Sequence, residues 1–298
     1  MKKKRLVFVL IVTVISLICL LYMNSYYDPL SRYPYDITET QKKNIVNRLN
    51  ENDIEYIIEY AIAPEEFYRY LLCNNFSIYR INEYNRLLGN YPTLDNQTIV
   101  NYYYFMEMKY GDDIDEQLRD HYYVHDVVNY YLDYPNAAPL VIEAGNLDTY
   151  VDADHSVGYY TPKNLTEVET SYGENILLRE EAASALENML AAMNSNLDKD
   201  VLKGFVINQG YVSYRVLNEM DPDIAPGTSD YQLGLSVVFN GGDSSFKESN
   251  IYQWLMNNAS RYGFVCYSDR EPYHFRYVGN ELAQSLSSMN LTFREAHE

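Results

Sequence analysis

The chain has 298 residues, 47% of them hydrophobic, which is enough to bury one large core or two smaller ones. It carries 23 Lys and Arg residues against 42 Asp and Glu residues, a formal net charge of −19. Such an acidic surface repels nucleic-acid phosphates and anionic lipid headgroups. We therefore expect no nucleic-acid partner, and neutral or cationic partners remain open.

The N-terminus predicts a membrane anchor. Three lysines and Arg5 precede an uncharged apolar run from residue 6 to residue 23, which is long enough to cross a bilayer as a helix. The basic flank favours the cytoplasmic side. The run ends in Tyr22 and Met23, without the small-residue cleavage site of a signal peptide. We predict a cytoplasmic flank at residues 1–5 and an uncleaved signal anchor at residues 6–23, which crosses the cell membrane once. We predict an extracytoplasmic location for the bulk of the chain.

Residues 24–137 predict a Tyr-rich, all-α region of helical hairpins. The expected helices begin at Thr38, at Asn52 or Asp53, at Pro64 and at Ser77, and the first places Ile45, Val46 and Leu49 on one face. The chain contains 33 tyrosines. Because tyrosine combines a large apolar ring with a polar tip, we expect most of them in the core and keep a binding face as the alternative.

Residues 138–298 predict an α+β domain with a mostly antiparallel sheet and flanking helices. The proline-framed segment 133–139 is typical of a linker. Beyond it we predict strands at residues 140–142, 204–207, 233–239, 263–267 and 274–278, and helices at residues 178–193 and 251–259. Strands that outnumber helices in this order favour an antiparallel sheet.

Three short strings carry the functional signal. They are Gly210-Tyr211-Val212-Ser213-Tyr214, residues 226–239, and Glu271-Pro272-Tyr273-His274-Phe275-Arg276-Tyr277-Val278-Gly279. Their order and separation, with Trp254-Leu255 and Tyr262-Gly263-Phe264 between the last two, resemble a degenerate member of the VanY-type D-alanyl-D-alanine carboxypeptidases, the M15B peptidase family. The resemblance covers residues 138–298. It implies an M15 peptidase-like fold, a bacterial cell envelope and a peptidoglycan stem peptide as ligand.

The resemblance also implies a remnant of a zinc site. In that family zinc activates water to cleave between two terminal D-alanines, which requires three protein ligands and an open position. The matching positions make Glu271 the remnant general base and His274 the remnant ligand. Tyr231 and Val238 occupy the two lost ligand positions, and Val212 replaces the arginine that holds the substrate carboxylate. We expect no cofactor, because valine has no donor atom and the reference pKa of tyrosine is about 10.

Other residues could rebuild a metal site. Asp230 adjoins Tyr231, but neighbouring strand residues point to opposite faces, so we expect Asp230 to point away. His121 and His125 have helical i, i+4 spacing, and we expect them on an ordinary polar face. A further cluster, formed by Asp152, Asp154 and His155, is expected in a solvated loop.

Three functions follow as hypotheses. The first is a pseudoenzyme that binds a wall peptide or an envelope protein through the old cleft. The residues expected to line this cleft are Tyr211, Ser213, Tyr214, Tyr231 and Tyr273. The second is an active zinc carboxypeptidase with a rebuilt site, and the third is a structural or regulatory envelope protein that acts through its helical region. Whether Cys73 pairs with Cys266 is left open.

Overall fold

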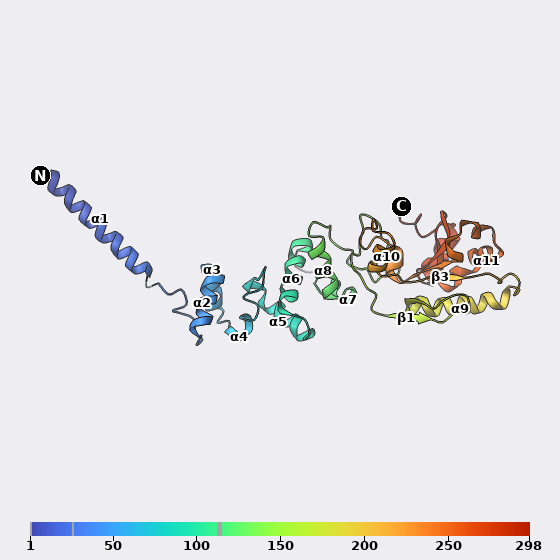
Figure 1. Ribbon diagram of the computed structural model, residues 1–298, viewed down its shortest axis with the longest axis horizontal. Coiled ribbons are helices and arrows are strands. Elements are labelled where there is room, and N and C mark those ends of the chain that lie inside the picture. Colours follow the sequence, from blue (N-terminus) through green and yellow to red (C-terminus); the bar gives the residue numbers. More distant parts are fainter. Residues whose placement is uncertain (1, 26, 112–114) are drawn as a thin grey trace. The chain divides into compact units, whose positions relative to one another are not determined.

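The computed structural model describes residues 2–25, 27–111 and 115–298 (Figure 1). The chain divides into two compact units, Met1–Tyr104 and Phe105–Glu298, and the division falls inside helix α6 (Asn96–Tyr110). Helices α7 (Asp115–His121) and α8 (Val124–Asp133) belong to the second unit. The domain boundary predicted between residues 137 and 138 stays a prediction.

Helix α1 (Lys2–Ser25) contains the residues of the predicted anchor. Its side chains Phe8, Leu10, Ile15 and Ile18 are exposed. Across the described residues, no helix has both the length and the apolar character needed to cross a membrane. The anchor therefore stays a prediction.

The rest of the first unit is helical, as the sequence predicts. Its helices are α2 (Glu39–Arg48), α3 (Glu51–Glu59), α4 (Pro64–Phe67), the 3-10 turn η1 (Ile78–Arg80), α5 (Ile81–Asn90) and the beginning of α6. Thr38 caps α2 through the backbone N–H of Gln41, as expected. The cap of α3 is Asn50, not Asn52 or Asp53, because its side chain accepts hydrogen bonds from both of their backbone N–H groups.

Tyrosines of this unit supply much of its core. Tyr70, Tyr84 and Tyr102 are buried, and the rings of Tyr70 and Tyr84 pack with centroids 5.3 Å apart. Val46, expected on the buried face of α2, is instead 38% exposed, whereas Ile45 is buried. The buried face predicted for α2 was therefore correct at Ile45 and wrong at the neighbouring Val46.

The second unit contains a four-stranded sheet in which every pairing is antiparallel, and this confirms the predicted sheet type. The strand order is β3 (Ile207–Gln209), β4 (Ser236–Phe239), β6 (Glu271–Tyr277) and β5 (Phe264–Ser268). A separate hairpin pairs β1 (Leu165–Val168) with β2 (Ile176–Arg179). The α-helices of this part are α9 (Glu180–Asn196), α10 (Tyr214–Met220), α11 (Asn250–Asn258) and α12 (Asn280–Met289). Its 3-10 turns are η2 (Asp230–Leu233), η3 (Asn240–Gly242), η4 (Ser244–Glu248) and η5 (Ala259–Tyr262).

Four predicted elements were wrong or displaced, and one of them is the strand expected at residues 204–207, which begins only at Ile207. Residues 140–142 form no strand, and Leu178 lies at the end of β2, before α9 begins at Glu180. The strand expected over residues 233–239 begins only at Ser236, because Gly234 adopts a left-handed conformation with φ 69° that ends the 3-10 turn before it.

The two faces of the sheet differ in chemistry. On one face Phe239 and Phe275 pack with ring centroids 5.6 Å apart, and Tyr252 of α11 packs against Phe275. On the other, β4 and β6 pair Ser236 with Arg276 and Val238 with His274. Directly paired residues share a face. The sheet therefore has an aromatic core on one side and presents a histidine and an arginine on the other.

Candidate functional site

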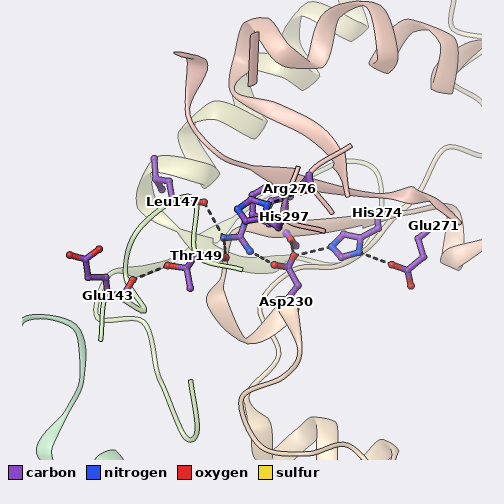
Figure 2. Close-up of polar contacts among 10 residues, drawn as sticks. Glu143, Leu147, Thr149, Asp230, Glu271, His274, Arg276 and His297 are labelled. Carbon is purple, nitrogen blue, oxygen red and sulfur yellow. Dashed lines mark hydrogen bonds and ion pairs between the residues drawn. The ribbon is translucent and has the colours of Figure 1, made fainter. Parts of the chain in front are cut away.

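Asp230 is the centre of the polar cluster on this face (Figure 2). Its carboxylate accepts hydrogen bonds from the guanidinium of Arg276 and the hydroxyl of Ser236, and its Oδ2 lies 3.1 Å from Nε2 of His274. We expected Asp230 to point away from this site. That expectation was wrong, because residues 230–233 form the 3-10 turn η2 and the alternation of strand side chains does not apply there.

Arg276 links Asp230 to the segment that contains Leu147 and Thr149. Its side chain has no exposed surface, and its Nη2 donates to the carbonyl oxygens of Leu147 at 3.1 Å and Thr149 at 3.0 Å. The guanidinium carbon also lies 4.9 Å from the ring centroid of Phe293. Since a buried arginine stays charged, Asp230 is its required counter-ion.

His274 has a carboxylate at each ring nitrogen. Nε2 faces Asp230, and Nδ1 lies 3.4 Å from Oε2 of Glu271 (Figure 2). The imidazole is 2% exposed and stacks against the rings of Tyr231 and Tyr267, at centroid distances of 4.8 and 4.3 Å. Both nitrogens are thus engaged, and the ring faces are covered by aromatic carbon.

The electrostatics of the cluster favour a protonated histidine. Burial lowers the pKa of His274, but the hydrogen bonds and charges of Asp230 and Glu271 outweigh burial and raise it above its usual value. Burial also acts to raise the pKa of Asp230, and Arg276 together with His274 overcomes this and holds it below its usual range. The hydrogen bond from His274 lowers the pKa of Glu271. Two carboxylates and two cations therefore balance within the cluster.

These residues do not fit a zinc ion. Each ring nitrogen of His274 faces a carboxylate, so neither nitrogen is directed at an open position where a metal could sit. Val238 lies directly opposite His274 in the strand register, where a ligand would be well placed, but its side chain is hydrocarbon. Burial, and next the charges of Glu271 and Asp230, raise the pKa of Tyr231, so its phenol stays neutral. Within the part of the chain described, no three His, Cys, Asp or Glu side chains are grouped to hold a metal.

The first string meets the second through the backbone. The N–H of Val212 donates to the carbonyl of Tyr231 at 3.2 Å. Glu271 and Tyr273 are two residues apart in β6, and burial, followed by the Glu271 charge, raises the pKa of the Tyr273 phenol. The structure therefore brings together Tyr231, Val238, Glu271, His274 and the backbone of Val212.

The remaining predicted cleft residues lie elsewhere on this domain. Ser213 caps α10 through the N–H of Val216, and Ser213 and Tyr214 line a groove of about 390 Å³ beside Tyr159. Tyr211 is half-buried, and burial is the main cause that raises the pKa of its phenol. The residues predicted to line one cleft are thus divided between two places. Tyr231 packs on the buried cluster around His274, and Ser213 and Tyr214 line the groove.

The alternative metal clusters are structural. Asp152 accepts hydrogen bonds from the backbone N–H groups of Asp154 and His155 and pairs with the His155 ring at 2.9 Å, as in an ordinary turn. His121 and His125 lie in different helices, so their i, i+4 spacing does not place them on one helical face. Nδ1 of His121 accepts the N–H of Gly145 instead. The three cysteines are free thiols.

Sequence reasoning missed Arg276 and Ser236 as members of the site. A signal for Arg276 existed, because it follows His274 by two residues in a strand and so shares its face. Ser236 could be found only with the register that pairs it with Arg276. Nothing local to Asp230 indicated a 3-10 turn rather than a strand.

The fold and site define an α+β domain with a charge-balanced cluster on an antiparallel sheet, and related proteins are carboxypeptidases. Carboxypeptidase YodJ of Bacillus subtilis is 29% identical over 171 residues, covering 47% of this chain and 63% of that protein. A D-alanyl-D-alanine carboxypeptidase of Enterococcus faecalis is 34% identical over 98 residues, covering 29% of this chain and 37% of that protein. The chain thus spans less than two thirds of the length of each relative. No family model matches the chain.

Solved structures of carboxypeptidases are also similar to this chain. The LdcB LD-carboxypeptidase has 27% identity and a TM-score of 0.45, over 53% of this chain and 88% of that one. VanYB in complex with D-alanine-D-alanine has 21% identity and a TM-score of 0.37, over 51% of this chain and 97% of that one. The sequence relatives confirm the resemblance to the VanY-type carboxypeptidases.

Proposed function

We propose that this chain is a membrane-anchored extracytoplasmic pseudoenzyme, which holds a cell-wall peptide or an envelope partner without cleaving it. The observation that carries the proposal is the state of His274. Both of its nitrogens face carboxylates, and the flanking ligand positions hold Val238 and the neutral phenol of Tyr231. Without a bound metal the domain has no means to activate water in the manner of a zinc peptidase.

The substrate end of the site supports the same proposal. A planar guanidinium is the natural partner of a terminal carboxylate, because it offers two parallel N–H donors. Val212 takes the position of that arginine and offers only methyl groups. The nearest arginine in the strings, Arg276, is fully buried and already paired with Asp230, so it is not available to a ligand.

Metal analysis tests the proposal directly. The purified full-length chain, incubated with excess zinc and then desalted, is expected to retain much less than one zinc per chain. It is also expected to release no D-alanine from a peptide ending in two D-alanines. Stoichiometric zinc together with D-alanine release would show an active enzyme and refute the pseudoenzyme.

Restoring the lost groups should restore metal binding. We expect the triple variant Tyr231→His, Val238→Asp, Val212→Arg to bind zinc tightly, because position 238 already lies opposite His274 in the register. Each single substitution should do little, since two ligands hold zinc far more weakly than three. Zinc uptake by the triple variant no better than that of the parent would show that the pairing of His274 with Asp230 and Glu271 prevents coordination even when ligands are supplied.

A further inference from the structure

The first unit contains a polar cavity of about 450 Å³, separate from the residues of the candidate site. It is lined by the end of α2, the beginning of α3 and the segment that leads into η1, and its polar side chains are Arg48, Asn50, Asp53, Asn75 and Ser77. Guanidinium, amide, carboxylate and hydroxyl groups together offer both donors and acceptors of hydrogen bonds. The cavity lies outside residues 138–298, so the resemblance to carboxypeptidases assigns it no role.

The cavity combines a fixed wall with polar groups that a ligand can use. Nη2 of Arg48 donates to the carbonyl oxygen of Cys73 at 2.9 Å, which holds the guanidinium in place. Ser77 precedes η1 without making a side-chain capping hydrogen bond. Asn75 is exposed, and its Nδ2 reaches Asn101 at the long distance of 3.4 Å. A hydroxyl and an amide on a fixed wall can bind a polar ligand with little loss of conformational entropy.

An aromatic stripe continues from the cavity along α3. Asp53 and Tyr56 in α3 and Tyr60 at its C-cap are spaced i, i+3 and i+7, so they share one face. The rings of Tyr56 and Tyr60 have centroids 4.6 Å apart, and Tyr79 packs 4.8 Å from Tyr56. Tyr79 also makes a hydrogen bond with Asp53 of the cavity wall. Tyr60 and Tyr79 are 62% and 51% exposed, so the cavity and the rings form one continuous surface.

The charge and chemistry of this surface select its ligand. Helix α3 has the sequence ENDIEYIIE, with four acidic residues and no basic one, and these outnumber Arg48 of the cavity. Such a surface disfavours an anionic ligand. Exposed tyrosine rings bind apolar faces, whereas the cavity wall binds hydroxyl and amide groups. A pyranose sugar has both features, because C–H groups cover the faces of its ring and hydroxyls surround its edge.

We propose that this surface binds an uncharged oligosaccharide, with one sugar unit in the cavity and the following units over the rings of Tyr60 and Tyr79. The cavity and the stripe lie one after the other, which suits an extended chain of repeating units. A peptide rich in proline and lysine would also stack on tyrosine rings, but it lacks the edge of hydroxyls that the polar wall favours. The inference goes beyond the proposed function, because it concerns another unit of the chain and a ligand of another class.

Calorimetric titration of the full-length chain, in a detergent without a sugar headgroup, tests the proposal. The probes are the linear tetramer of N-acetylglucosamine, its monomer, the sulfated tetramer, and a short peptide rich in proline and lysine. We expect the neutral tetramer to bind at least about tenfold more tightly than the monomer, because only the tetramer reaches both the cavity and the rings. The sulfated tetramer should bind at least about tenfold more weakly than the neutral one, because the acidic residues of α3 repel it.

Three variants locate the binding site. Tyr60→Leu and Tyr79→Leu each remove one exposed ring and should weaken binding of the tetramer about tenfold. Ser77→Ala removes a hydroxyl from the cavity wall and should weaken it about threefold to tenfold. Each should leave the thermal midpoint nearly unchanged, since these side chains are exposed or make no capping bond. The matched control is Tyr91→Leu, at an exposed tyrosine of the same unit that does not line the cavity, which should bind as the parent does.

Four results would overturn the proposal. The first is no binding of the neutral tetramer, and the second is equal binding of the sulfated one, which would show that charge does not select the ligand. The third is binding of the peptide without binding of the tetramer, which would make the surface a peptide site. The fourth is parental binding by both Tyr60→Leu and Tyr79→Leu, or an equal loss in Tyr91→Leu, which would place the sugar elsewhere on the chain.

Discussion

Replacing Arg276 with methionine is expected to lower the free energy of unfolding by about 3–5 kcal/mol. Methionine fills much of the same volume, but it leaves Asp230 buried at 6% exposure without its strongest counter-charge. It also leaves the carbonyl oxygens of Leu147 and Thr149 without their donor. Urea unfolding followed by circular dichroism measures the change.

The matched control for this prediction is Arg294→Met. Arg294 pairs with Glu298 at 2.6 Å, but the two side chains are 43% and 57% exposed. An exposed pair contributes little, so this substitution should change the free energy of unfolding by no more than about 0.5 kcal/mol. If the two variants lose similar amounts, the buried cluster does not contribute to stability as the structure indicates.

The stability of the chain is expected to fall as the pH rises above about 6.5, in a way that depends on His274. The pKa of His274 is raised in the folded state above its usual 6.5, so the folded state holds a proton that the unfolded state has lost. The stabilisation is complete below pH 6.5 and disappears as the pH passes through the folded pKa. One proton corresponds to a slope of up to about 1.4 kcal/mol per pH unit.

The His274→Gln variant isolates this effect. Glutamine keeps a polar side chain near Asp230 but cannot take up a proton, so the difference in slope between parent and variant belongs to His274. Urea midpoints between pH 6 and pH 8 suffice, because Cys266 has a usual pKa of 9.0 and stays largely protonated in the unfolded state below pH 8. Equal slopes in parent and variant would mean that folding does not raise the pKa of His274, which would contradict the ionic cluster.

At acidic pH the stability of the chain is expected to change in the opposite direction, because it depends there on Asp230. The pKa of Asp230 is lowered from 3.8 in the folded state, so its stabilisation is present above pH 3.8 and is lost as the pH falls through the folded value. The ionic cluster should therefore stabilise the domain most between about pH 4 and pH 6.5, where Asp230 is charged and His274 is protonated.

The sequence alone determined the secondary structure of the domain where local signals were strong. The apolar runs at residues 263–267 and 274–278 became β5 and β6, because short runs rich in aromatic and β-branched residues with glycine beside them favour buried strands over helices. The strings also singled out His274 and Glu271, and the family resemblance predicts that Val238 and Tyr231 stand where metal ligands would be. These inferences need only the identity of a side chain, since a hydrocarbon cannot coordinate a metal in any fold.

The tertiary structure decided which charges meet. Asp230 and His274 are 44 residues apart in the chain, and their contact depends on a 3-10 turn that ends at Gly234. Arginine is rarely buried, so no local pattern predicts that Arg276 lies fully inside with Asp230 as its partner. The groove beside α10 depends likewise on the ring of Tyr159 stacking against that of Tyr214, which comes from a distant segment of the chain. Local propensity acts over a few residues, whereas ion pairs and aromatic walls form between segments that only the packed chain brings together.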